Sequence, residues 1–139
     1  MQTTQTTPDT GATQVFIVDD SLSIRTRLSE MLATMGDIAI VGEAGSAPDA
    51  VHGILQTRPH SVLLDLNLCG RSGIEVLRVV HKQAPEIVFV VLTNHSEPQY
   101  RRACTLAGAS YVLDKSTEFE RIPAILSSIA AGARNQETP

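Results

Sequence analysis

Three aspartates, a threonine and a lysine each lie at or just beyond the end of a short apolar run. The residues are Asp19 and Asp20 after 15–18, Asp65 after 62–64, Thr93 after 87–92, and Lys115 after 111–113. Carboxylates that gather in one place repel each other and raise one another's pKa unless a cation is present. Mg²⁺ prefers oxygen ligands and retains some of its water. These residue types therefore predict a magnesium site with a lysine beside it.

Phosphoryl transfer is the chemistry that suits this set. A carboxylate can act as a nucleophile and form an aspartyl-phosphate, while the protein positions the groups and neutralises charge on the transferring oxygens. Asp65 is the expected acceptor, because three aliphatic residues lead directly into it, as in a strand buried on both faces. A cation held by Asp20 and Asp65 would bridge the phosphoryl oxygens. Lys115 would pair with another oxygen as a point charge, and the Thr93 hydroxyl would hydrogen-bond a third.

The elements that carry these residues alternate between two periodicities. Five short apolar runs read as strands, at 15–18, 38–41, 61–65, 86–92 and 111–113. Between and after them, apolar residues recur every three or four positions, which predicts five helices with one core-facing stripe each. Strands that alternate with helices through short connections form a parallel sheet covered on both faces. The expected fold class is therefore α/β, doubly wound, with the five polar positions meeting at the carboxyl edge of the sheet.

Several helix ends are also marked in the sequence. Ser21 is expected to cap the first helix, and Ser46 with Asp49 the second. The last helix carries Phe119 in the same apolar stripe as 122, 126 and 129. Pro123 falls inside this helix, so its start is expected to be irregular.

The length and composition fit one globular domain. The chain has 139 residues, which we divide into a flexible N-terminal tail at 1–13, a domain at 14–133 and a C-terminal tail at 134–139. The net charge of −4 argues against a general surface for nucleic acid or anionic membranes. No apolar run is close to the length of about 20 residues that is needed to cross a bilayer. No signal peptide is expected either, so a cytoplasmic location is predicted. Both cysteines are expected to be free thiols.

Over roughly 14–132, the chain resembles the receiver domains of two-component response regulators. The matching motifs are Val18-Asp19-Asp20, Leu63-Leu64-Asp65, Gly73 at the start of the third helix, Val91-Leu92-Thr93 and Leu113-Asp114-Lys115-Ser116. The resemblance implies a flavodoxin-like sheet with strand order 2-1-3-4-5. It also implies that the protein is a phosphorylated signalling protein rather than an enzyme, with slow loss of its own phosphoryl group.

The resemblance implies roles for individual residues. Asp65 would take a phosphoryl group from a histidine of a kinase or a phosphotransfer protein. Asp20 would bind Mg²⁺ directly, Asp19 mainly through water, and Asn67 through its backbone carbonyl. The residue after Thr93 is usually small in the family and is Asn94 here, and the next residue, His95, lies at a position that together with Asn67 is known in the family to modulate phosphate lifetime. This bulky pair is expected to obstruct attacking water or the incoming donor, with an exposed loop as the equal alternative for His95.

Three positions depart from the family pattern. Cys69 and Ser116 stand where the family usually has prolines. The aromatic switch usually lies three residues before the lysine, where this chain has Val112, and Tyr111 is one residue earlier. Because strand side chains alternate between faces, Tyr111 cannot simply replace that aromatic. We therefore expect the coupling through Thr93 to differ, with Tyr111 serving either in packing or on a partner surface.

The protein is expected to pass on its signal through contact with another protein. No further domain is expected after Gly132, so the sequence predicts a stand-alone receiver that acts on a downstream protein target, without nucleic acid or membrane. A monomer or a phosphorylation-dependent dimer is expected. Donor docking would use the first helix near Ser21–Leu28. In the family, the changing face is built from the fourth helix, fifth strand and fifth helix, here Gln99, Tyr100, Arg101, Arg102, Val112 and Phe119.

Two other functional classes were weighed. A pseudo-receiver would keep the fold as a constitutive binding module, which the altered switch favours and the full acidic set with Lys115 opposes. A Mg²⁺-dependent phosphohydrolase would need a second acid two residues after the nucleophile, where this chain has Asn67. The phosphoacceptor reading is therefore preferred.

Overall fold

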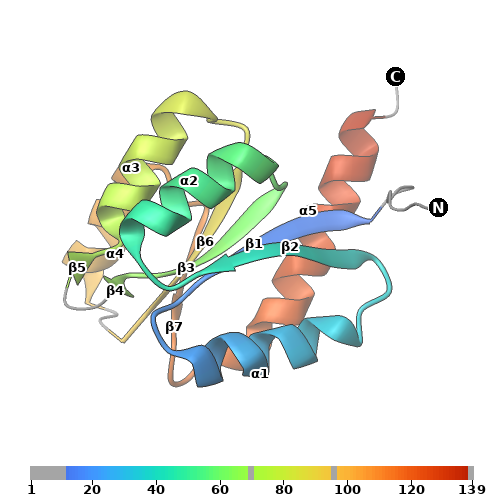
Figure 1. Cartoon of the computed structure of the whole chain (residues 1–139), viewed down its shortest axis with the longest axis horizontal. Helices are drawn as coiled ribbons and strands as arrows, with labels where there is room; N and C mark the ends of the chain where they lie inside the picture. Colours follow the sequence, from blue (N-terminus) through green and yellow to red (C-terminus); the bar gives the residue numbers. More distant parts are fainter. Residues whose placement is uncertain (1–11, 69–70, 95–96, 138–139) are drawn as a thin grey trace.

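A five-stranded parallel sheet forms the centre of the molecule. The computed structural model describes residues 12–68, 71–94 and 97–137. The strands of the sheet are β1 (Thr13–Val18), β2 (Ile38–Ala44), β3 (Ser61–Asp65), β6 (Val88–Thr93) and β7 (Tyr111–Asp114). Their order is β2-β1-β3-β6-β7 (Figure 1). This is the 2-1-3-4-5 order of the flavodoxin-like fold, so the predicted fold is confirmed.

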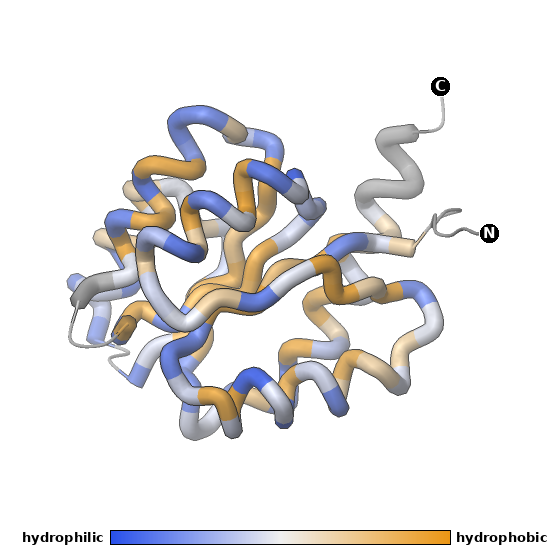
Figure 2. Tube along the Cα trace, in the orientation of Figure 1, coloured by the Kyte–Doolittle hydropathy of each residue, from blue (hydrophilic) through white to orange (hydrophobic). Residues whose placement is uncertain are grey.

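Helices cover both faces of this sheet. On one face lie α1 (Leu22–Ala33) and α5 (Ile122–Glu137), and on the other lie α2 (Ala47–Thr57), α3 (Ile74–Gln83) and α4 (Pro98–Ala107) (Figure 1). Because successive strand side chains point to opposite faces, the core has two halves. Leu63 packs with α1 and α5, whereas Leu64 packs with the other three helices. Figure 2 shows the apolar residues running along the central strands.

The helix starts follow the expected capping chemistry. The Ser21 hydroxyl accepts a hydrogen bond from the Ile24 amide at 3.3 Å, and the Ser46 hydroxyl accepts one from the Asp49 amide at 3.3 Å. At the end of α2, Arg58 adopts a left-handed conformation with φ of 50°, and Pro59 prevents the helix from continuing. These caps fix where the loops at the edge of the sheet begin and end.

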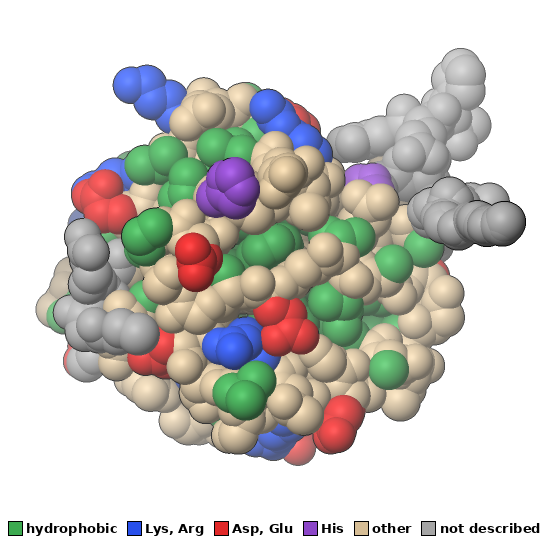
Figure 3. Space-filling view, in the orientation of Figure 1, with side chains coloured by type: hydrophobic (Ala, Val, Ile, Leu, Met, Phe, Trp, Pro, Cys, Tyr) green, Lys and Arg blue, Asp and Glu red, His purple; other side chains and the backbone are tan. Residues whose placement is uncertain are grey.

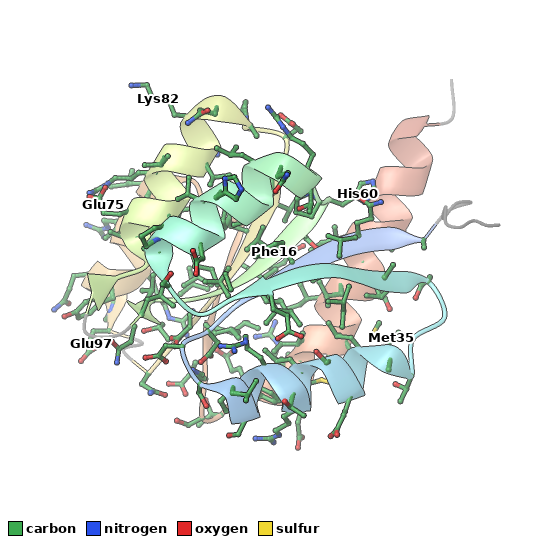
Figure 4. The ribbon with its side chains drawn as sticks, in the orientation of Figure 1. Phe16, Met35, His60, Glu75, Lys82 and Glu97 are labelled. Carbon is green, nitrogen blue, oxygen red and sulfur yellow. The ribbon has the colours of Figure 1, made fainter. Side chains whose placement is uncertain are left out.

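Phe16 of β1 shows how closely α2 packs over β1 and its neighbour β2. A Cβ atom on Gly42 of β2 would lie 2.5 Å from the Phe16 ring, and one on Gly53 of α2 would lie 2.7 Å from it. The Phe16 ring therefore fills space that two glycines leave open, and Figure 4 shows it between α2 and the sheet. This packing holds β1, and hence the loop that follows it, against β2.

Several element boundaries differ from those expected. A short antiparallel hairpin, β4 (Asn67–Leu68) and β5 (Arg71–Ser72), follows β3 where only a loop was expected. Two-residue strands have too little periodicity to be read from a sequence. The first strand begins at Thr13, which is buried, so it starts one residue inside the expected tail. β2 extends to Ala44, and α5 extends to Glu137, beyond the expected domain end.

The last helix begins irregularly, as Pro123 predicts. A 3-10 turn, η2 (Phe119–Arg121), precedes α5, so Pro123 lies in the first turn of the α-helix, where a missing backbone N–H costs little. Glu118 precedes this turn without a side-chain capping bond.

Two further sequence expectations concern the cysteines and the membrane. Cys104 is a buried, free thiol, and burial raises its pKa, while Cys69 lies outside the described residues. Within the part of the chain that the structure describes, no helix is long and apolar enough to cross a bilayer. On the face drawn in Figure 3, acidic and basic side chains are interspersed, and they form no continuous basic surface there.

Candidate functional site

The carboxyl edge of the sheet brings the predicted polar residues together. Asp65 is the last residue of β3 and pairs in register with Leu92, one residue before Thr93. Thr93 pairs with Asp114, directly before Lys115. A single cavity of about 520 Å³ at this edge is lined by Asp19, Asp20, Asp65, Asn67, Thr93, Asn94 and Lys115 among others. Residues separated by up to 96 positions therefore share one site, because all five strands end on the same side.

Lys115 bridges two of the carboxylates. Its Nζ lies 2.7 Å from Asp19 Oδ2 and 3.1 Å from Asp65 Oδ2. Both aspartates are buried, and the lysine side chain is 16% exposed. Burial alone would lower the pKa of Lys115, but hydrogen bonds and charge attraction from Asp19 and Asp65 raise it above its usual value. The lysine is therefore a fixed positive charge at the floor of the cavity.

Asp65 is held at the end of β3 with one oxygen toward Lys115 and the other toward the following loop. Its Oδ1 accepts a hydrogen bond from the Asn67 amide at 3.2 Å. Burial raises the pKa of Asp65 above its ordinary value, and the Asn67 amide and Lys115 oppose that rise. A partly desolvated carboxylate that keeps a lysine beside it is suited to accept an electrophilic phosphorus.

The acidic cluster has the donor chemistry of a magnesium site. Asp19, Asp20 and Asp65 each offer a carboxylate oxygen within 4.8 Å of the others, and Asp20 is exposed while the other two are buried. Mg²⁺ is commonly held by one or two carboxylates together with water. The exposed Asp20 leaves one side of the cluster open for that water. The residues therefore fit the predicted ion. Asn67, whose carbonyl was expected as a further ligand, lines the same cavity.

Gly73 lets α3 begin directly against the acceptor strand. Its amide donates to the Leu66 carbonyl at 2.6 Å, and a Cβ at this position would lie 2.6 Å from the Asp65 backbone oxygen and 3.2 Å from Leu66 Cα. Backbone atoms cannot rotate away as a side-chain tip can. The expectation that Gly73 opens the third helix is thus met for a steric reason.

The substitution Gly73→Ala is expected to destabilise the protein by about 1–3 kcal/mol, the usual cost of forcing an extra group into packed surroundings. Urea unfolding monitored by circular dichroism measures this. Gly36→Ala is the matched control, because a Cβ there meets nothing within 4 Å. Equal stability of the two variants would contradict the steric role of Gly73.

The two positions expected to modulate phosphate access are only partly described. Asn94 is exposed and lines the cavity, and its Oδ1 lies 3.5 Å from the Ser116 hydroxyl. His95 lies outside the described residues. Asn94 therefore lies at the mouth of the cavity, where it can contact whatever enters.

The two residues near the expected switch, Tyr111 and Val112, lie next to each other in β7 and have their side chains on opposite faces of the sheet. Val112 packs against the half of the core that lies on the α2, α3 and α4 face, whereas Tyr111 packs against the half on the α1 and α5 face. Tyr111 also lines a second cavity of about 460 Å³, together with Ser128 and Ile129 of α5, and is absent from the lining of the carboxylate cavity. The two side chains thus lie on opposite faces, as the strand alternation predicts.

Tyr100 is the aromatic that reaches the acidic cavity. It lies in the first turn of α4 and lines the cavity together with Ala103 and Cys104 of the same helix. We expected Tyr100 only on a partner surface. A signal was available, since Tyr100 and Cys104 are four residues apart and share one helix face.

Arg101 connects α4 to the strand and loop beside it. Its guanidinium donates to the Val112 carbonyl at 2.6 Å and to Glu118 at 3.3 Å, and Glu118 also accepts from the Asp114 amide at 2.8 Å. The Asp114 amide, with Arg121 and Arg101, holds the pKa of Glu118 below its usual value. Arg102, the next residue, is exposed, as a surface position should be.

Phe119, expected on the same surface, is instead buried. It belongs to the core of α1 and α5, and the Arg27 guanidinium lies 4.3 Å from its ring centroid. Its assignment to a partner surface was wrong. Its position in the apolar stripe of the last helix, which predicts burial, was correct.

Comparison with known proteins gives a consistent result. The family model for the response regulator receiver domain matches residues 15–127. The transcriptional regulatory protein YhcZ of Bacillus subtilis is 33% identical over 109 residues, covering 78% of this chain and 51% of that protein. The DNA-binding transcriptional activator DevR/DosR of Mycobacterium tuberculosis is 29% identical over 119 residues, covering 86% of this chain and 55% of that protein. The chain thus spans about half the length of these curated relatives.

Solved structures show the same similarity. A LuxR-family two-component response regulator from Aurantimonas superposes with a TM-score of 0.80 at 26% identity, over 87% of this chain and 86% of that one. The signal receiver domain of the putative response regulator NarL from Mycobacterium tuberculosis superposes with a TM-score of 0.76 at 27% identity, over 85% and 96%.

Proposed function

Because this chain belongs to the response regulator receiver domain family, in which phosphorylation and Mg²⁺ binding are typical, we propose that it accepts a phosphoryl group on Asp65. The donor is a histidine of a kinase or phosphotransfer protein. The observation that carries the proposal is the burial of Asp65 at the end of β3, with Lys115 Nζ 3.1 Å from one carboxylate oxygen and inside a cavity lined by Thr93.

The chemical step is a displacement at phosphorus. One carboxylate oxygen of Asp65 attacks the phosphorus, the bond from phosphorus to the histidine nitrogen breaks, and its electron pair returns to the imidazole. The protein contributes positioning and charge neutralisation. Lys115 pairs with one phosphoryl oxygen, and the Thr93 hydroxyl donates to another. Asp65 enters as the carboxylate, and Lys115 keeps its proton throughout because its pKa is raised.

Three carboxylates and one carbonyl are proposed to hold the ion. Asp20 would bind Mg²⁺ directly, Asp19 would bind it through water, and Asp65 and the Asn67 carbonyl would complete the protein ligands. When bound, Mg²⁺ supplies positive charge to the phosphoryl oxygens. The exposed position of Asp20 and the oxygen spacing of the cluster support this assignment.

The phosphodonor is proposed to approach along the start of α1. Leu22 is 66% exposed immediately after the loop that carries Asp19 and Asp20, and Ser21 lines the acidic cavity. An exposed apolar side chain beside the site offers contact area to a partner helix. We therefore place donor docking at Ser21–Leu28.

The state of Asp65 is proposed to be read through α4. Phosphorylation adds roughly 1.5 to 2 negative charges to the site. Tyr100 lines that cavity, and its neighbour Arg101 bonds to the Val112 carbonyl and to Glu118. A change at the cavity therefore reaches the surface made of α4, β7 and the start of α5, with Arg101 and Arg102 facing a protein target. The stand-alone character expected from the sequence stays a prediction, because the curated relatives are about twice as long.

The substitution Arg101→Met tests this route. Loss of the two guanidinium contacts is expected to speed amide hydrogen exchange in α4 and at Val112, measured by mass spectrometry, and to reduce the change that phosphorylation produces there. Arg102→Met is the control, since that exposed neighbour should leave exchange unchanged. Identical exchange in the two variants would remove Arg101 from the route.

Intact-mass spectrometry tests the phosphoacceptor proposal itself. With Mg²⁺ and a small acyl phosphate, the protein is expected to gain one phosphoryl group that is stable in acid and lost in base. No gain with any donor would instead favour the pseudo-receiver, in which the same fold serves as a constitutive binding module.

A further inference from the structure

Arg25 links the acidic loop to the neighbouring helix and strand. It lies near the start of α1, and its Nη1 donates a hydrogen bond of 2.5 Å to the backbone carbonyl of Asp19. That carbonyl belongs to the peptide unit between Asp19 and Asp20. A donor fixed on this oxygen therefore fixes the plane of the peptide that joins the two acids.

The guanidinium is itself held from the other side. Its Nε donates to Glu43 Oε1 of β2 at 3.1 Å, and the Ser29 hydroxyl donates to the second oxygen of Glu43 at 3.2 Å. A Cβ on Gly45 would lie 3.0 Å from Arg25 Nη1, so the head group packs closely against that backbone. The Arg25 side chain is only 17% exposed. A planar guanidinium that is hydrogen-bonded on two sides keeps one orientation.

The remaining polar atoms of Asp19 are all bonded. Its amide donates to the Ala44 carbonyl at 3.1 Å, and its carboxylate accepts from the Ser21 amide at 2.9 Å and from Lys115 at 2.7 Å. Arg25 supplies the bond to the one remaining atom, the carbonyl oxygen. Four hydrogen bonds therefore hold Asp19, and they fix the direction in which the backbone continues to Asp20.

We propose that Arg25 is a positioning residue for Mg²⁺, which orients the Asp19–Asp20 peptide so that the Asp20 carboxylate meets the ion beside Asp65. The inference rests on the metal site of the proposed function. Neighbours that orient metal ligands typically change metal affinity by about 10- to 100-fold when they are removed. Arg25 acts through the backbone of the ligand loop and does not touch the ion.

The sign of the effect separates this role from two others. Arg25 is a cation near a cation site, so its charge alone opposes Mg²⁺ binding, and removing it would tighten binding. A purely structural role would lower the melting temperature and leave the affinity of the folded protein unchanged. Positioning predicts weaker binding after removal of Arg25.

The experiment is calorimetric titration of the folded protein with magnesium chloride. Arg25→Met keeps the aliphatic stem and is expected to weaken Mg²⁺ binding by about 10-fold. The melting temperature should then rise less at a given Mg²⁺ concentration, since stabilisation by a ligand follows its dissociation constant. Arg58→Met is the matched control, because its exposed ion pair with Glu86, at 3.3 Å, is of similar length and lies before the starts of β3 and β6, at the opposite end of the sheet from the site. It should bind Mg²⁺ as the unmodified protein does.

A double variant removes the charge argument entirely. Arg25→Met with Glu43→Gln deletes one positive and one negative charge, so the net charge near the site is unchanged. Weak binding in the double variant supports positioning, and recovery of the original affinity overturns it. Glu43→Gln alone leaves Arg25 supported on one side only and should weaken binding to an intermediate degree. Unchanged or tighter binding in Arg25→Met also overturns the inference, whereas failure of the unmodified protein to bind Mg²⁺ would instead overturn the metal site.

Discussion

Asp65→Asn is expected to abolish phosphoryl uptake while leaving the protein folded. An amide is no nucleophile toward phosphorus, and it keeps the size and shape of the carboxylate that ends β3. With Mg²⁺ and a small acyl phosphate, intact-mass spectrometry should show one added phosphoryl group on the unmodified protein and none on the variant. The loss should be complete, because the other two carboxylates of the site, Asp19 and Asp20, are assigned to the ion rather than to the phosphorus.

The control for this experiment is a second aspartate-to-asparagine change far from the site. Asp49 lies exposed in the first turn of α2, and Asp49→Asn should take up phosphate normally. Undiminished uptake by Asp65→Asn would move the acceptor to another residue. Peptide mapping of the base-labile group would then identify that residue.

The same substitution also has an expected effect on stability. Burial raises the pKa of Asp65, so the folded state binds a proton at this group more tightly than the unfolded chain. The stability that this group contributes is present below its unfolded pKa and is lost as the pH rises through the raised value. Asp65→Asn removes that loss, so without Mg²⁺ it should unfold at an equal or higher urea concentration at neutral pH. A lower midpoint would show that the charged carboxylate stabilises the fold.

The parts of the site that could be predicted are those that the parallel sheet fixes. Once Asp65 and Thr93 were read as strand ends, their convergence followed, because parallel strands connected by right-handed crossovers end at one edge. The separation of Tyr111 from Val112 followed from strand alternation alone. Neither of these two inferences depends on how a particular side chain is oriented.

The parts that could not be predicted depend on side-chain reach and on short elements. Arg25 contacts the Asp19 carbonyl from the following helix, and no periodicity marks such a bond. The hairpin β4–β5 is too short to leave a pattern. Phe119 is the instructive error. Its place in the apolar stripe correctly predicted a core residue, whereas the resemblance to the family assigned it to the exposed partner surface. For that residue, the local physical pattern was the better guide.

Lys115→Met is expected to have the largest effect on stability without Mg²⁺. Removing one partner of a buried ion pair typically costs about 3–5 kcal/mol, because the other charge stays buried without compensation. Here two carboxylates, 1% and 7% exposed, would be left facing each other. Urea unfolding in a chelating buffer should show a loss near the low end of that range, about 3 kcal/mol, because the lysine is partly accessible.

Three comparisons separate charge loss from loss of packing in Lys115→Met. Lys82→Met removes an exposed lysine, which Figure 4 shows at the outer end of α3, and should change little. Mg²⁺ should restore much of the loss in Lys115→Met, since the ion replaces the missing positive charge. The double variant with Asp65→Asn should also recover stability, because residues that share one network are not additive. If the double variant is as unstable as Lys115→Met alone, then the lysine stabilises the site by packing, and repulsion between Asp19 and Asp65 contributes nothing measurable.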